Sequence, residues 1–174
     1  ENENNETVVP FAAYKTGGNI QNFIIDDSDI SAKLRGLYFT DNRNLEVTNL
    51  TTDFKYSDTE MIYDDFFLET ENSKIKSQIK FSYKEEDLDD FNNKVYIKAD
   101  FDKSTLAITD LKKFYNELNG NDILNFEGEF RGKMNNFDLN KLNLSSKNGM
   151  QIIGDLNFRN AVDTENGFQF KGNL

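Results

Sequence analysis

Carboxylates are the main candidates for binding a metal ion or for acid–base chemistry here, because the 174-residue sequence has no histidine and no cysteine. This excludes Ser-His-Asp triads, Cys-His pairs and most zinc, iron and copper sites. Acidic residues gather in segments 26–29 and 85–90, which carry the oxygen ligands that Ca²⁺ prefers. Neither segment has the ligand spacing and central glycine of an EF-hand loop, so we interpret both as solvated loops.

Glu127 and Glu129 form a carboxylate pair of the kind that glycosidases use. Strand alternation accounts for the pair more simply, since residues i and i+2 share one face of a strand. The sequence therefore predicts no catalytic residues, no metal site and no cofactor. We expect a protein that is not an enzyme.

The overall charge limits the partners that the chain can have. The formal net charge is −11 with a pI near 4.5, and the basic residues are spread along the sequence. Nucleic acid and anionic lipid surfaces would be repelled, so neither is expected as the main partner. The aromatic content of 13% argues against a disordered chain, because aromatic side chains drive collapse.

Alternation with a period of two dominates the sequence. In segment 125–135, Phe126, Phe130 and Met134 fall on even positions with Gly128 and Gly132, while charged residues occupy the odd positions. Such alternation predicts a strand with one apolar and one charged face. It recurs in segments 75–83, 95–101, 152–158 and 168–174, and in segment 45–56, where a slip near Asn49 predicts a β-bulge.

One segment has helical spacing instead. Leu111, Phe114, Tyr115 and Leu118 follow a helical period, and Gly120 comes just after them. The sequence predicts a helix that begins after Thr109 or Asp110 and docks these apolar side chains on the sheet. Segment 84–91 has a weaker helical pattern and is interpreted as an acidic loop.

The fold class predicted is all-β: a curved antiparallel β-meander that forms a U-shaped groove, with one short helix near residues 110–118. Residues 1–19 are interpreted as a polar N-terminal tail or a cut point, and residues 20–174 as a single β-groove segment of a longer repeat protein. One short helix is too small to cover so many apolar strand faces. A closed β-sandwich that binds a glycan or a protein, and a barrel, are the other arrangements that would bury them.

The spacing of the apolar residues and turns along these strands resembles the repeat of TamB proteins of the AsmA-like superfamily, in the form found in Bacteroidetes. The similar segments are 45–50, 54–60, 67–75, 81–83, 110–115, 126–134 and 152–156. The resemblance implies a β-groove (a β-taco) in the periplasm of a Gram-negative bacterium, on a protein anchored in the inner membrane. It implies lipid transport between the inner and outer membranes, or outer-membrane protein assembly and translocation with an Omp85-class partner bound through regions outside this segment.

In that reading the apolar faces of the strands line a common groove for phospholipid acyl chains, which need a dry lining without directed bonds. The predicted lining residues are Val95, Ile97, Phe101, Phe126, Phe130, Met134, Ile152, Leu156, Phe158, Phe168 and Phe170. Glycines on the same face leave room for a bend or a ligand.

Overall fold

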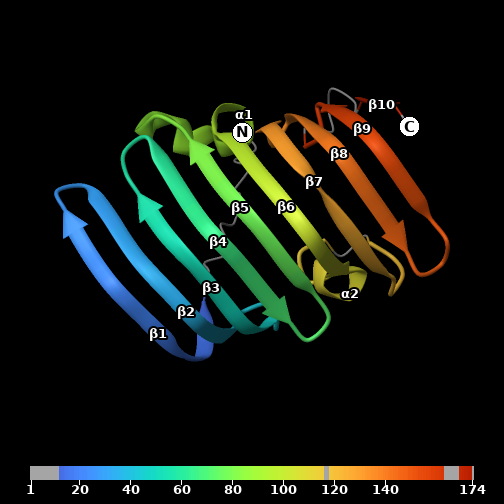
Figure 1. Ribbon diagram of the computed structural model, residues 1–174. Coiled ribbons are helices and arrows are strands. Elements are labelled where there is room, and N and C mark those ends of the chain that lie inside the picture. The colour runs from blue at the N-terminus through green and yellow to red at the C-terminus, as the bar shows by residue number, and fades with distance from the viewer. Residues whose placement is uncertain (1–11, 116–117, 163–168, 174) are drawn as a thin grey trace, which may run out of the picture.

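The computed structural model describes residues 12–115, 118–162 and 169–173, and the strands of these residues form one antiparallel sheet (Figure 1). Each strand pairs with the next along the chain, so the strand order in the sheet is the order in the sequence. The predicted all-β antiparallel meander is confirmed. The strands are β1 (Ala13–Asp26), β2 (Asp29–Asp41), β3 (Glu46–Tyr56), β4 (Glu60–Thr70), β5 (Lys74–Ser82), β6 (Tyr96–Ala107), β7 (Ile123–Lys133), β8 (Asn136–Ser146), β9 (Gln151–Arg159) and β10 (Gln169–Asn173).

The described strands make a single open sheet rather than the two packed sheets of a sandwich. Close contacts between strands join sequence neighbours, from β1 and β2 to β9 and β10. β1 begins at Ala13, so part of the predicted polar tail is strand. Among the described residues, no helix is long and apolar enough to cross a membrane.

The apolar side chains line up across the sheet because directly paired residues share one face. We call this face the inner face. One row of it crosses eight strands, and a second row lies beside it from Ile30 of β2 to Phe158 of β9. The first row consists of Ala32, Phe54, Tyr63, Ile79, Ala99, Phe130, Leu139 and Leu156.

The strands bend along a line of register shifts. Every pair from β1–β2 to β8–β9 contains at least one shift, and the shift after Val47 confirms the bulge predicted near Asn49. Gly36, Asp65 and Lys141 have left-handed backbones at the shifts of β2, β4 and β8. An extra residue bends a strand and moves the following side chains to the other face. The apolar residues stay on the inner face because their parity changes at the same point.

Side chains of the adjoining strand bind the backbone at these bulges. The N–H groups of the left-handed residues Gly36, Asp65 and Lys141 donate hydrogen bonds to side chains of β3, β5 and β9. The acceptors are Thr51 Oγ1 at 3.0 Å, Gln78 Oε1 at 3.2 Å and Asp155 Oδ1 at 2.8 Å. Because an unpaired backbone N–H is costly, these acceptors stabilise the bend.

On the inner face, buried hydroxyl groups also bind the backbone of the adjoining strand, here by donating to carbonyl oxygens. Thr52 Oγ1 donates to the carbonyl oxygen of Asp64 at 2.8 Å, and Ser77 Oγ donates to that of Asp100 at 3.0 Å. Thr52 is fully buried and Ser77 almost so.

Arginines on the outer face repeat one arrangement. The Nη1 atoms of Arg35, Arg131 and Arg159 each donate to two backbone carbonyls, at 2.6–3.1 Å. Each guanidinium also pairs with an aspartate of an adjoining strand; these are Asp53, Asp100 and Asp138. The hydrogen bond from Arg35 lowers the pKa of Asp53. Because the pairs are partly exposed, they contribute little free energy and serve mainly to hold neighbouring strands in register.

The predicted short helix is present, but its extent and its packing differ from the prediction. The helix there, α2, spans only Ile108–Leu111 and follows directly on β6. Phe114 and Tyr115 are 46% and 53% exposed, so neither docks on the sheet. Phe114 instead packs under the guanidinium of Arg43, 4.8 Å from the ring centre. Asp110, one of the two residues after which the helix was expected to begin, lies within α2 and is buried.

Segment 84–91 is also helical rather than an open loop. It forms the 3₁₀ helix η1 (Glu85–Asp90), which leads into the one-turn helix α1 (Phe91–Lys94). Beside these helices lies the buried cluster of Tyr83, Val95 and Ile97. Tyr56, Met61, Phe81, Phe130 and Met134 pack against that cluster.

Candidate functional site

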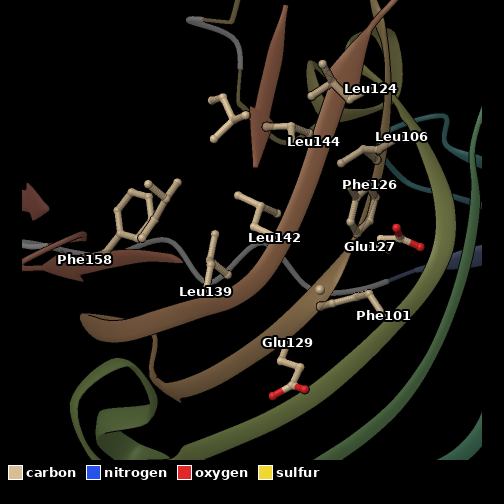
Figure 2. Close-up of a pocket in the computed structure, with 13 residues that line it drawn as sticks. Phe101, Leu106, Leu124, Phe126, Glu127, Glu129, Leu139, Leu142, Leu144 and Phe158 are labelled. Carbon is tan, nitrogen blue, oxygen red and sulfur yellow. The ribbon is translucent and has the colours of Figure 1, made fainter. Parts of the chain in front are cut away.

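An apolar hollow lies on the inner face over β6 to β9, and its volume is about 400 Å³. Figure 2 shows β7 and β8 bending around it, with labelled leucines on the concave side. The lining residues come from four consecutive strands. They are Phe101, Leu106, Leu124, Phe126, Glu127, Gly128, Glu129, Leu139, Leu142, Leu144, Ile152, Leu156 and Phe158.

The strand register explains why these residues meet. On one side of the bend, Phe126 pairs with Leu144, which pairs with Ile152. On the other side, Leu139 pairs with Leu156. Between them lies Gly128, which also lines the hollow.

Gly128 is required at this position by the backbone. Its φ is +149°, a conformation that residues with a side chain rarely adopt. A Cβ atom there would lie 3.1 Å from the carbonyl oxygen of Asn140 and 3.2 Å from the Cα of Leu142. Gly128 therefore allows β8 to approach β7 closely at the bulge of β8.

The lining offers no group that would bind a polar ligand atom. Glu127 and Glu129 are the only charged residues in it, and their carboxylates point to the convex side (Figure 2). There Asn143 Nδ2 donates to Glu127 at 3.1 Å, and Lys141 Nζ donates to Glu129 at 2.5 Å. The contact with Glu129 raises the pKa of Lys141. The site can exclude water and bury hydrocarbon, but it cannot orient a polar group.

The predicted lining residues fall into three groups. Phe101, Phe126, Ile152, Leu156 and Phe158 lie together in the hollow. Val95 and Ile97 are buried in the cluster beside η1 and α1, and Phe130 and Met134 are partly buried and pack against that cluster; none of these four lines the hollow. Phe168 lies outside the described residues, and Phe170 lies in β10, where it pairs with Phe158. Contact of any of these residues with lipid remains a prediction.

Sequence reasoning missed the leucines of β8, although that strand lies at the centre of the hollow. Its apolar residues are Phe137 and Leu139 before the bulge at Lys141, and Leu142 and Leu144 after it. The change from odd to even positions hid the alternation. Leu106 and Leu124 were missed as well; they pair directly with each other across β6 and β7.

Over β3 to β5 the inner face is filled rather than hollow. The ring of Tyr63 lies 5.1 Å from that of Phe54 and 6.1 Å from those of Phe66 and Phe81, measured between centroids. Burial raises the pKa of Tyr63. Aromatic side chains thus pack together on the inner face of these strands, whereas the inner face over β6 to β9 carries the hollow.

The fold and the hollow define the class of this protein: an open, single-sheet antiparallel β protein with an apolar depression on its inner face. No family model, no curated protein and no solved structure matches the chain. Within the described ranges, no group of three or more carboxylates is placed so that it could hold a metal ion.

Proposed function

We propose that this chain is a segment of an open β-groove that holds phospholipid acyl chains. The observation that carries the proposal is the hollow over β6 to β9, which is apolar and lacks groups that would bind a polar atom. Each buried methylene contributes about 0.8 kcal/mol without any directed bond. An acyl chain is therefore a ligand that such a lining can bind and release along its length.

The wider proposal follows the resemblance to TamB proteins. The chain then belongs to a periplasmic protein of a Gram-negative bacterium that supports lipid transport between the two membranes or outer-membrane protein assembly, without enzymatic activity. Regions outside the chain would provide the inner-membrane anchor and the contact with an Omp85-class partner. The uninterrupted meander and the apolar inner face support this function, because each added strand lengthens the groove.

The alternative was a closed β-sandwich that binds a glycan or a protein. Such a sandwich buries its apolar face against a second sheet. The described strands form one sheet, and the hollow on its inner face has no counterpart sheet over it. The described strands therefore do not form a closed sandwich.

Photo-crosslinking at neighbouring positions tests the proposal. A benzophenone amino acid replaces Leu156, which lines the hollow, or Asp155, which is exposed on the outer face. The purified chain is irradiated with palmitoyl lysophosphatidylcholine and weighed by mass spectrometry. We expect the mass of one lipid to be added at position 156 and none at position 155. Equal labelling at both positions, or none at either, would contradict the proposal.

A further inference from the structure

The hollow ends abruptly at β6. Its lining residues come from β6 to β9, and Phe101 is the aromatic residue that β6 contributes. The Phe101 ring lies 5.4 Å from the Phe126 ring, at 61° to it. This edge-to-face contact holds the Phe101 ring in place at the β6 end of the hollow.

Phe101 stands between two small residues in one cross-strand row. It pairs with Gly128 on β7 and with Ser77 on β5, and Ser77 pairs with Phe66 on β4. Ser77 is 4% exposed, and its hydroxyl is directed to the carbonyl oxygen of Asp100. The row therefore has bulk at Phe66 and Phe101 and little bulk between them.

We infer that Phe101 is a specificity-determining residue: its ring stops a single unbranched hydrocarbon chain that lies along the hollow, and so limits the chain length bound. The inference rests on the proposed function, because it takes the occupant to be an acyl chain. A volume of about 400 Å³ lies at the lower end of the range for ligand sites, roughly 300–1,000 Å³. It suits one hydrocarbon chain, whose polar end stays outside.

Removal of the ring would extend the hollow toward β4. In the Phe101→Ala variant, the volume that the ring now occupies joins the hollow, and the next side chains of the row are Ser77 and the bulky Phe66. A longer chain could then bury further methylenes. Each methylene corresponds to about a fourfold gain in affinity.

The experiment measures affinity against chain length. Saturated fatty acids from octanoate to behenate displace a fluorescent fatty acid from the purified chain. For the wild type we expect affinity to rise with length and then to level off. For Phe101→Ala the affinity continues to rise by about fourfold per methylene before it levels off at a longer chain.

A matched control separates this effect from general loosening. Phe54→Ala truncates a phenylalanine on β3 that packs against Tyr63 and does not line the hollow. We expect its length profile to equal that of the wild type. An equal shift in Phe54→Ala, or an unchanged profile in Phe101→Ala, overturns the inference.

The outcomes also distinguish the inference from the function on which it rests. If no protein binds any fatty acid, the proposed function fails. If all bind with one common profile, only the role of Phe101 fails. Urea unfolding checks that each variant is folded, and Phe101→Leu, which removes less bulk, carries the test if the alanine variant is unfolded; its profile must then level off at a longer chain than that of the wild type.

Discussion

Asp110 fixes the short helix α2 to the turn between β4 and β5, and its removal should destabilise the protein. Its Oδ2 accepts hydrogen bonds from Thr70 Oγ1 at 2.6 Å and from Ser73 Oγ at 2.5 Å. All three residues are at most 7% exposed. Ser73 Oγ in turn accepts from the N–H of Ala107 at 3.0 Å, so the network joins the end of β6 to the turn.

The magnitude follows from these two bonds. A hydrogen bond to a charged group contributes roughly 1.5–3 kcal/mol, and the cost of burying the carboxylate offsets part of the sum. We expect Asp110→Ala to lower the free energy of unfolding by about 3 kcal/mol. Asp110→Asn, which keeps one acceptor oxygen, should lower it by roughly half as much.

Urea unfolding followed by far-ultraviolet circular dichroism measures the effect. With a denaturant slope of about 2 kcal/mol per M, the midpoint of Asp110→Ala should fall by roughly 1.5 M. Thr109→Ala, at the exposed neighbouring position, is the control and should change stability by less than about 0.5 kcal/mol. If both variants unfold at the same urea concentration, the network does not stabilise the fold and the reasoning is refuted.

Three further predictions concern backbone strain, the exposed helix end and pH. Gly132→Ala should lower the free energy of unfolding by about 3 kcal/mol, because φ is +135° and the new Cβ would lie 2.5 Å from the carbonyl oxygen of Asn136. Gly36 also has a left-handed backbone, but a Cβ there would meet no other atom, so Gly36→Ala should lower the free energy of unfolding by only about 1 kcal/mol in the same urea titration. Phe114→Asp should lower stability by no more than about 1 kcal/mol, since the ring is half exposed and makes mainly a cation–π contact; a loss of 3 kcal/mol or more, roughly that of a buried aromatic ring, would show that the ring is buried in solution. Burial raises the pKa of Tyr63 above its ordinary value of 10.0, so the unfolded chain ionises first and stability should fall as the pH rises past 10.0; in Tyr63→Phe this fall, measured by urea midpoints at increasing pH, should be shallower.

The sequence was most informative where strands are regular. In β7 and β9 the apolar residues of the inner face keep one parity, from Phe126 to Phe130 and from Ile152 to Phe158, and the sequence placed them on one face. In β8 the bulge at Lys141 reverses the parity, so four apolar residues that share one face did not show a common period. Alternation within one strand indicates a face only between bulges.

Contacts between distant segments were also beyond a reading of local pattern. Phe130 and Phe126 have the same parity on β7, but Phe130 packs against the buried cluster beside η1 and α1 while Phe126 lines the hollow. The helix at residues 108–111 shows the same limit. Helical spacing pointed to Phe114 and Tyr115, whereas the buried hydrogen bonds of Asp110 hold the single helical turn further upstream.

The exclusive pairing of each strand with its sequence neighbours has a consequence for cooperativity. When each unit touches only the units on either side, the stability of the whole is close to a sum of local and nearest-neighbour terms. Unfolding should then begin at the edges, at β1 and β10, and proceed inward, so that amide hydrogen exchange slows from the outer strands toward β5 and β6. The same independence means that adding or removing a hairpin at an edge would leave the register of the remaining strands undisturbed, so sheets of different length can share one cross-section.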